Sequence, residues 1–453
     1  MKIIQLKSDV AVIGAGPGGI PAALAAARHG AKVILAERNG HVGGNAVMGL
    51  PLLGYLDQNG TRIIGGIAQE FVDDLMETGD CFGHQRCPMH NSITLVHPER
   101  LKLDMLKKLR DAQVQLLLHV ELADAVVENG RIKKAIMIGK ATRVEIEAKV
   151  FIDATGDGDL AQLCGASPEK GIDGVVQPPT VMFSLTGFQH EGFFDFLEAH
   201  PENMRQLDSV MVSGGYDTRL WRSTPSYVFV GMQAYLRELR EKLDCPVLRE
   251  NIIYINSTLP GKIFVNTVRV PGCDGSDIMS LTNGEIEGQL QIPGIVDMLK
   301  NHVPGFENCA LDNISPAIGI RESNRYRGLK RLTLQNVLNG DVPEDTIALG
   351  GYKVDIHNGR GEGTVLMEVK KPYGIPMGCV VSKEVDGLLL SGRCISMDSE
   401  ALASERVMPI CMAVGQGAGT LAALAVRDGK SPGEMEPRPV CDALRRDGAI
   451  LNV

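Results

Sequence analysis

The chain lacks the features that would favour a membrane protein, a nucleic-acid binder or a disulfide-stabilised fold. Its 453 residues contain no uninterrupted apolar run of about 20 residues, the length that a membrane-spanning helix needs. Lysine and arginine total 46 against 55 acidic residues and form no cluster, so the chain carries no electrostatic footprint for nucleic acid or an anionic membrane surface. Ten cysteines are scattered without a CxxC pair, a pattern that favours reduced thiols. We therefore expect a cytoplasmic protein that binds neither nucleic acid nor a membrane.

What the chain does have at its start is a strand, a tight turn, a helix and a second strand. Residues 8–14 form a short apolar run of β type and lead into glycines. An Ala/Leu-rich segment, Pro17–His29, then stops at Gly30, a common signal for the end of a helix. A second apolar run, Lys32–Ala36, follows at once. This order predicts a Rossmann-type βαβ unit within a parallel sheet.

Three glycines occupy the turn between the first strand and the first helix. Gly14, Gly16 and Gly19 follow the G-x-G-x-x-G pattern. In this pattern the first glycine allows the tight turn, the second leaves room for a pyrophosphate, and the third allows close packing of helix on strand. Glu37 ends the second strand, where a carboxylate can accept hydrogen bonds from ribose hydroxyls. The strand, helix, second strand and carboxylate at these spacings predict a bound adenine dinucleotide.

The residues alone leave the choice between NAD and FAD open. Gly43 and Gly44 suit a tight passage along the ribityl and pyrophosphate stretch of a flavin, and an ordinary loop accounts for them equally well. The segment after Gly44 (NAVMGL) has no cysteine, and no second G-x-G-x-x-G occurs in a βαβ context. Both absences argue against a pyridine-nucleotide disulfide oxidoreductase.

The rest of the chain favours an α/β nucleotide-binding domain that is interrupted by an insert. Residues 123–149 alternate apolar and polar side chains around turn signals, as in an antiparallel meander. Between 175 and 312 the pattern changes, and Trp221 lies there with many of the Phe and Tyr residues. Strands are also expected at Val114–His119, Val150–Asp153 and Gly387–Ser391, and a final helix at Pro409–Asp428. We predict the first part of the nucleotide-binding domain at 1–174, an inserted mixed α+β substrate domain at 175–312, and the return of the first domain at 313–453.

Several segments together resemble a known family. They are HVGGNAVMG, FIDATGDGDLA, GIRESNRYRG, YKVDIH, PYGIPMGCVVSKEVDGLLLSGRCIS and SERVMPICMAVGQGAGTLAALA. The chain resembles the FAD-dependent oxidoreductases of the glutathione-reductase-like superfamily, related to fumarate-reductase-type flavoproteins. The resemblance covers nearly the whole chain and is weakest between about 185 and 290. It implies a glutathione-reductase-like FAD-binding domain.

The resemblance also implies which residues hold FAD. Leu122 matches a backbone contact to adenine, and Ala154 to Gly156 match a motif beside the cofactor. Gly415 to Gly417 match a turn that aims a helix N-terminus at the pyrimidine side of the flavin, where it would stabilise the reduced form. Close helix packing by small residues is the alternative for these glycines. The predicted cofactor-binding residues are Gly14, Gly16, Gly19, Glu37, Arg38, Gly44, Asn45, Leu122, Ala154, Thr155, Gly156, Gly392, Arg393, Gly415 and Gln416.

One position departs from the family pattern. Members of the family usually carry two consecutive basic residues after the RE dipeptide, whereas this chain has Asn324 before Arg325. If the basic pair helps to bind an anionic substrate, we expect this chain to prefer a less charged one.

Cysteines and histidines recur at three-residue intervals in one segment: Cys81, His84, Cys87 and His90. Such side chains can bind zinc or iron. However, Gly83 and Pro88 would break a continuous helix, and the spacing matches no familiar metal knuckle. We therefore predict no metal site and interpret the four residues as structural or pocket-lining.

Charged and polar residues inside the family-like segments are candidates for chemistry: Arg321, Arg325, His357, Tyr373 and Arg406. An arginine can clamp a carboxylate or carbonyl oxygen, and a histidine can move the proton that accompanies hydride transfer. Ion pairs on the surface or between domains are the alternative. We predict Arg321, His357 and Arg406 as the catalytic residues, with Arg321 orienting the substrate and His357 acting as acid or base.

The leading hypothesis is therefore an FAD-dependent oxidoreductase that transfers hydride between a small organic substrate and flavin N5. The alternative is a flavoprotein that passes electrons to an acceptor protein, because no second nucleotide site supplies or removes them. A third class, a Rossmann-type NAD enzyme, would bind NAD and not FAD. The sequence leaves the substrate, the reaction direction and assembly into a homo-oligomer open.

Overall fold

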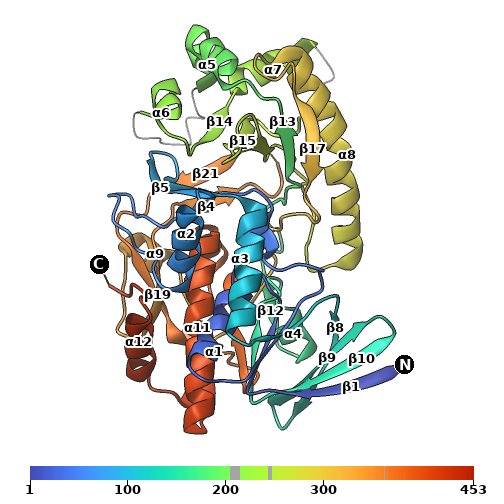
Figure 1. The fold of residues 1–453 in the computed structure, drawn as a ribbon, viewed down its shortest axis with the longest axis vertical. Coiled ribbons are helices and arrows are strands. Elements are labelled where there is room, and N and C mark those ends of the chain that lie inside the picture. The colour runs from blue at the N-terminus through green and yellow to red at the C-terminus, as the bar shows by residue number, and fades with distance from the viewer. Residues whose placement is uncertain (205–214, 243–246, 362, 453) are drawn as a thin grey trace.

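A parallel sheet of five strands lies at the centre of the lower half of the molecule in Figure 1. The computed structural model describes residues 1–204, 215–242, 247–361 and 363–452. Four of the five strands are wholly apolar or nearly so and completely buried, as expected where helices cover both faces of a parallel sheet. In spatial order the strands are β23 (Leu388–Leu390), β11 (Val150–Asp153), β2 (Val10–Ile13), β3 (Val33–Ala36) and β7 (Gln115–Leu117). The predicted βαβ unit and the strands near 115, 150 and 388 are confirmed.

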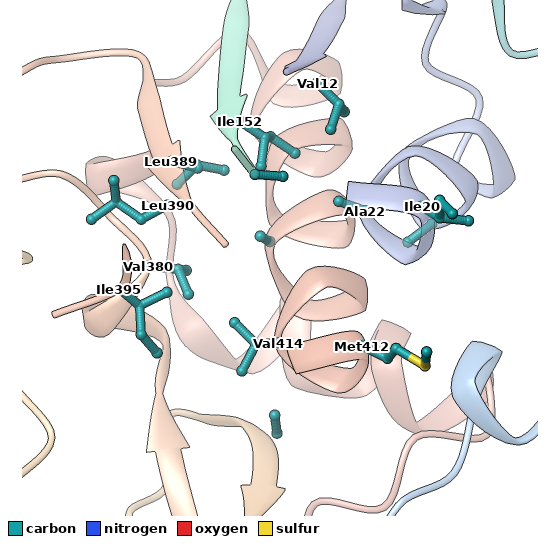
Figure 2. Close-up of a cluster of buried hydrophobic side chains, with 14 of the residues drawn as sticks. Val12, Ile20, Ala22, Ile152, Val380, Leu389, Leu390, Ile395, Met412 and Val414 are labelled. Atoms are coloured by element: carbon teal, nitrogen blue, oxygen red, sulfur yellow. The ribbon is translucent and has the colours of Figure 1, made fainter. Parts of the chain in front are cut away.

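Two helices pack closely against each other beside this sheet. The glycine turn leads into α1 (Gly19–Arg28), which ends before Gly30 in a left-handed conformation, and α11 (Met408–Asp428) crosses it. Figure 2 shows Val12, Ile152 and Leu389 of three neighbouring strands close to α11, which carries Met412 and Val414. The sheet, α1 and α11 therefore share one apolar core.

The helix α11 is long and apolar enough to cross a membrane by length and composition. In this fold, 89% of its most apolar stretch is buried inside the protein. Its composition is thus accounted for by the core that it helps to form.

The predicted antiparallel meander is present, with one addition. It consists of β8 (Glu121–Glu128), β9 (Arg131–Gly139) and β10 (Thr142–Glu147). The first strand of the chain, β1 (Lys2–Lys7), pairs in parallel with β10 and extends the meander to four strands. This pairing joins residues 140 positions apart, which a local pattern does not reveal.

The upper half of the molecule contains an antiparallel sheet with its own core (Figure 1). The strands in spatial order are β14 (Val228–Gly231), β15 (Ile252–Asn256), β16 (Ile263–Val265), β13 (Phe183–Thr186) and β17 (Ala310–Ile314). The helices are α5 (His190–Ala199), α6 (Thr218–Ser223), α7 (Gln233–Lys242) and α8 (Ile278–His302). Phe193, Trp221, Phe229 and Tyr254 pack together in this core, so the aromatic content of the segment serves folding. Met89 and Ile93 of the N-terminal half join the same core, and the predicted domain boundaries stay a prediction.

The remaining strands and helices complete the fold. The strands are β4 (Leu52–Leu53), β5 (Cys81–Cys87), β6 (Asn91–Val96), β12 (Pro168–Lys170), β18 (Asn324–Tyr326), β19 (Thr346–Gly350), β20 (Val354–His357), β21 (Thr364–Met367) and β22 (Tyr373–Pro376). The helices are α2 (Ile67–Glu77), α3 (Pro98–Asp111), α4 (Asp159–Leu163), α9 (Leu334–Asn339), α10 (Ser399–Glu405) and α12 (Pro437–Arg446). Nine cysteines are free thiols, and Cys245 lies outside the described residues. Together these elements make a mixed α/β fold with a parallel sheet, as predicted.

Candidate active site

A cleft lies at the carboxyl ends of the parallel strands. Here β2 and β11, which are neighbours, connect onward to opposite sides of the sheet, a position where open α/β sheets bind ligands. The structure brings most of the predicted cofactor residues to this cleft: Gly14, Gly16, Glu37, Arg38, Gly44, Asn45, Leu122, Ala154, Thr155, Gly156, Gly392 and Arg393. Gly19, Gly415 and Gln416 lie outside its lining.

The three glycines of the turn have different surroundings. A Cβ atom on Gly14, where φ is +101°, would lie 2.3 Å from the Ala154 carbonyl oxygen, and one on Gly19 would lie 1.8 Å from the Gly14 carbonyl oxygen. A Cβ on Gly16 would meet nothing within 4 Å. Gly14 and Gly19 are therefore required by the packing of the chain itself, whereas Gly16 leaves open space in the cleft.

Glu37 ties the glycine turn to the following loop. One carboxylate oxygen accepts a hydrogen bond from the Ala15 amide (2.8 Å), and the other accepts from the Asn39 backbone and side-chain nitrogens (2.8 Å each). The residue is 7% exposed and lines the cleft. Because the oxygen that accepts from Ala15 has a second acceptor site, the predicted contact with ribose hydroxyls is compatible with these bonds.

The loop after β11 is held by a buried aspartate that sequence reasoning missed. Asp153 accepts hydrogen bonds from the Thr155 amide (3.1 Å), the Thr155 hydroxyl (2.7 Å) and the Ala161 amide (2.8 Å). These bonds shape the segment that carries Ala154, Thr155 and Gly156 past the cleft. Burial, together with the Asp157 and Asp153 carboxylates, raises the pKa of Asp159 at the cleft to about 7.

The predicted turn at Gly415 to Gly417 was wrong. The helix α11 begins at Met408, so these glycines lie in its interior. A Cβ on Gly415 would lie 2.1 Å from the Gly18 carbonyl oxygen, which means that this glycine allows α11 to approach α1. The Gln416 side chain accepts a hydrogen bond from the Ile67 amide at the start of α2 (2.9 Å) and points away from the cleft. It is the first turn of α11, with Met408 and Cys411, that lines the cleft.

A second cavity, called the chamber here, adjoins the cleft. Five residues line both: Asn45, Ile320, Arg393, Arg406 and Met408. The chamber lies between the two halves of the molecule, because Val228, Ile253 and Asn266 of the upper half line it together with Leu50 and Leu53 of the lower half. Its charged and imidazole side chains are Arg249, Arg321, Arg393, Arg406, Glu250, Asp355, His90 and His357. All three predicted catalytic residues therefore face one cavity.

The guanidinium groups of the chamber retain donors for a ligand. Arg321 Nη1 donates to the Pro178 carbonyl (2.5 Å), and its other nitrogens make no hydrogen bond within the described part of the chain. Arg406 Nη2 donates to the Asp355 carbonyl (2.9 Å), while its buried Nε has no partner among the described residues. Burial and the neighbouring Arg249 and Arg406 hold the pKa of Arg321 well below its ordinary value. This crowding of positive charge favours a bound anion.

Arg249 belongs to this group and was not predicted. It is 4% exposed, and burial lowers its pKa to about 10. It lies just before β15 in the segment where the family resemblance is weakest, and no local pattern sets it apart from a surface arginine. Only the fold brings it to the chamber.

His357 is held on both sides of its ring. Burial, together with the positive Arg321 and Arg249, lowers its pKa to about 3, so the ring is neutral near pH 7. With its proton on Nε2 it donates to Asp355 Oδ2 (3.3 Å) and accepts at Nδ1 from Thr364 Oγ1 (3.1 Å) and Arg249 Nη2 (3.4 Å). Burial alone would raise the pKa of Asp355, but His357, Arg406 and Arg321 lower it below its ordinary range. Asp355 is therefore ionised and offsets part of the charge of the arginines.

Two other candidates have structural partners away from the chamber. Arg325 is 3% exposed and pairs with Glu322 (2.8 Å), and the Tyr373 hydroxyl bonds to Ser404 (2.9 Å). Asn324 Nδ2 donates to Gln162 Oε1 (3.2 Å) and does not line the chamber. The expectation of a less charged substrate, which was based on this position, therefore stays a prediction.

The Cys/His segment forms a strand whose side chains point to different places. His84 bonds to Thr94 (2.8 Å) and Gln69 (3.0 Å), and the Cys81 sulfur accepts from the Gly83 amide. Only Cys87 and His90 meet, with 3.5 Å between Sγ and Nδ1. No group of three or more metal-binding side chains converges within the residues that the structure describes.

Comparisons with known proteins give the following matches. A model of the family described as FAD-dependent oxidoreductase matches residues 9–446. Thiamine thiazole synthase of Thermococcus kodakarensis is 28% identical over 176 residues, which are 37% of this chain and 64% of that protein. The enzyme of the same name from Aeropyrum pernix is 29% identical over 163 residues, 34% of this chain and 56% of that protein. This chain thus spans less than two thirds of the length of these relatives.

Among solved structures, one match is a geranylgeranyl bacteriochlorophyll reductase-like protein from Thermoplasma acidophilum. It has a TM-score of 0.47 and 12% identity, covering 98% of this chain and 85% of that chain. A flavin-dependent brominase has a TM-score of 0.49 and 12% identity, covering 97% of this chain and 83% of that chain.

Proposed function

The chain belongs to the FAD-dependent oxidoreductase family, and we propose that it oxidises or reduces a small organic anion held in the chamber beside the cleft. Family membership makes the chain an oxidoreductase with FAD as its cofactor. The finer assignment, to the glutathione-reductase-like flavoproteins related to the fumarate-reductase type, is part of this proposal. It is supported by the βαβ unit, the meander and the returning C-terminal segment.

The residues of the cleft fit FAD. Gly16 leaves bare main chain beside the start of α1, whose first turn contains no acidic residue, so a pyrophosphate meets amide groups and a positive helix end. Glu37 would hold the ribose, and the backbone near Leu122 the adenine. Arg393 Nη1 is buried without a partner among the described residues, and the first turn of α11 faces the same end of the cleft. When bound there, FAD supplies a flavin N5 that accepts or donates hydride.

One observation carries the choice of an anionic substrate: the chamber is lined by four arginines and two carboxylates. Arg393 pairs with Asp157 (2.9 Å). Glu250 lies 3.6 Å from Arg269 and also interacts electrostatically with Arg249, whereas Asp355 is shared by Arg249, Arg321 and Arg406. Both histidines are neutral near pH 7, so they do not change this balance. A carboxylate would satisfy the spare donors of Arg321 and Arg406 in a two-pronged geometry. We assign Arg321 and Arg406 to holding and orienting the substrate.

The chamber also favours an enzyme over an electron-transfer component. A protein that only relayed electrons would have no need for a cavity with several arginines next to its cofactor. The acceptor protein and the homo-oligomer stay predictions.

The proposal is tested with purified holoprotein under anaerobic conditions. A panel of small carboxylic acids, hydroxy acids, sugars and cyclic alcohols is added, and bleaching of the flavin absorbance is followed. We expect at least one acid to bleach the flavin, and Arg321→Met to weaken kcat/KM for it by about 100-fold, the cost of losing a charge-assisted hydrogen-bonded pair. Arg360→Met, at an exposed position outside the chamber, is the matched control and should match the wild type. Bleaching by neutral sugars or alcohols alone, or protein without extractable FAD, would refute the proposal.

A further inference from the structure

The turn between β5 and β6 brings an unassigned histidine into the chamber. Met89 and His90 line the cavity, and His90 is held from behind by Cys87, whose sulfur lies 3.5 Å from Nδ1. Its other ring nitrogen, Nε2, makes no hydrogen bond to any residue that the structure describes. A ring that lines a cavity and is fixed through one nitrogen, while the other has no protein partner among the described residues, is arranged to exchange a proton with a ligand.

The second imidazole of the chamber is placed less well for this task. His357 donates from Nε2 to Asp355 and accepts at Nδ1 from Thr364 and Arg249. To take a proton from a substrate it would have to give up one of these contacts. The predicted role of His357 as acid or base therefore competes with a residue that has a free nitrogen.

The surroundings of His90 keep its ring neutral near pH 7. Burial is the main cause and lowers its pKa to about 4, Asp355 acts in the opposite direction, and Lys353 adds to the lowering. Lys353 is paired with Glu368 (2.7 Å) and also donates to the Pro88 carbonyl (3.0 Å). Burial raises the pKa of the Cys87 thiol to about 11, so this neighbour is an uncharged thiol and not a thiolate. At neutral pH the ring can therefore accept a proton.

We propose that His90 Nε2 is the proton-transfer group of the chamber and that Cys87 is the residue that positions it; this rests on the function proposed above. The tautomer with hydrogen on Nδ1, donated to the Cys87 sulfur, leaves the Nε2 lone pair directed at the substrate. In the oxidative direction the substrate loses its C–H hydrogen with both electrons as hydride to FAD, the oxidant. Its O–H or N–H bond breaks at the same time, and the proton passes to His90 Nε2 and on to solvent. In the reductive direction the reduced cofactor returns the hydride and His90 the proton.

The geometry is tested first, independently of turnover. Holoprotein is treated at neutral pH with diethyl pyrocarbonate, which acylates unprotonated imidazole nitrogens, and the labelled peptides are followed by mass spectrometry. We expect His90 to react about tenfold faster than His84 and His357, whose two ring nitrogens are both engaged. Equal rates for the three would overturn the assignment whether or not a substrate has been found.

The role is tested with the acid of the panel that bleaches the flavin fastest. His90→Gln should slow bleaching by about 100-fold or more, the usual contribution of a positioned base. The wild-type rate should rise through about pH 4 and then level, because the base must be unprotonated, and this limb should be absent in the variant. His84→Gln, a change of the same type on the preceding strand β5, should retain the wild-type rate. FAD content and melting temperature confirm that each variant is folded.

If Cys87 positions His90, replacing it by alanine and by serine should affect the reaction rate differently. Cys87→Ala should lower kcat with little change in KM, and Cys87→Ser should restore most of the rate because a hydroxyl can replace the contact to Nδ1. If no panel member bleaches the flavin but His90 is labelled fastest, the proposed function fails while the placement of His90 stands. If bleaching occurs and His90→Gln stays within threefold of the wild type, the inference about His90 fails alone.

Discussion

The glycine turn offers a sharp test, because only one of its glycines faces open space. We predict that Gly19→Ala unfolds the chain more easily, whereas Gly16→Ala leaves it stable and weakens FAD binding. A Cβ on Gly19 would lie 1.8 Å from the Gly14 oxygen, at least 1.2 Å closer than real contacts of this kind, and that oxygen is backbone. Overpacking of this type costs about 1–3 kcal/mol or more. At Gly16 the same methyl group meets no protein atom within 4 Å, so its cost appears only when phosphates approach the main chain.

These costs translate into measurable shifts. A loss of about 3 kcal/mol lowers the melting temperature by roughly 3 °C when 453 residues unfold together, which we expect as the minimum for apo Gly19→Ala. Apo Gly16→Ala should melt within about 1 °C of the wild type, while a binding cost of about 1–3 kcal/mol raises its Kd for FAD roughly 5- to 150-fold. Calorimetry of the apoproteins and flavin fluorescence titration measure the two quantities. If Gly16→Ala destabilises the apoprotein as much as Gly19→Ala does, or binds FAD like the wild type, the division of roles is wrong.

Three further predictions concern the supports of the site. Gly415→Ala should lower the melting temperature by several degrees, because the new methyl would lie 2.1 Å from the Gly18 backbone oxygen; Gly417→Ala, which meets only the movable Ile347 side chain, should be milder. Asp153→Asn should cost about 2 kcal/mol and weaken FAD binding in titrations, since the buried carboxylate accepts three hydrogen bonds from its loop. Glu405 is fully buried, and burial raises its pKa to about 8, so the folded state binds a proton that the unfolded state has released between about pH 4.5 and 8. Wild-type stability should therefore fall by about 1 kcal/mol per pH unit across this window. In Glu405→Gln the fall should be smaller by this amount, and an identical pH dependence of the two proteins would contradict the prediction.

Much of the lower half could be predicted because its signals are local. The run VAVI, the glycines and the Ala-rich helix lie within 30 residues. The alternation of apolar and polar residues at 123–149 has the period of two that is typical of strands. The pairing of β1 with β10 could not be predicted, since it depends on the path of the whole intervening chain. The glycines of α11 show how a family match can mislead. The segment GQGAG is compatible with a turn and with a closely packed helix. In the structure it lies inside α11, where Gly415 packs against the Gly18 backbone.

Some residues of the candidate site could likewise be predicted from local sequence signals, and others could not. Glu37, Thr155 and Arg393 follow strands or turns that the sequence marks, and the structure brings them to one cleft. Arg249 carries no local signal, and nothing in the sequence separates the buried pair of Arg325 and Glu322 from the open guanidinium of Arg321. Whether the donors of an arginine have hydrogen-bond partners depends on residues more than 100 positions away in the sequence, such as Pro178 for Arg321. Partner and solvent access, which decide chemistry, are thus tertiary properties.

The placement of charge in the two cavities provides separate sites for two anions, the pyrophosphate of the cofactor in the cleft and the proposed substrate in the chamber. Glu37 and Asp157 in the cleft, and the buried Asp153 behind it, are occupied with amide, hydroxyl and guanidinium donors, so a pyrophosphate in the cleft is met by main-chain groups at the start of α1. A dipole end and amide groups neutralise phosphate without a mobile cation. The guanidinium groups are thereby left for the chamber, where Arg321 and Arg406 retain free donors. Because Arg393 and Arg406 line both cavities, the site for the cofactor and the site for the substrate share a wall, and an anion on these arginines would lie next to the flavin end of the cleft.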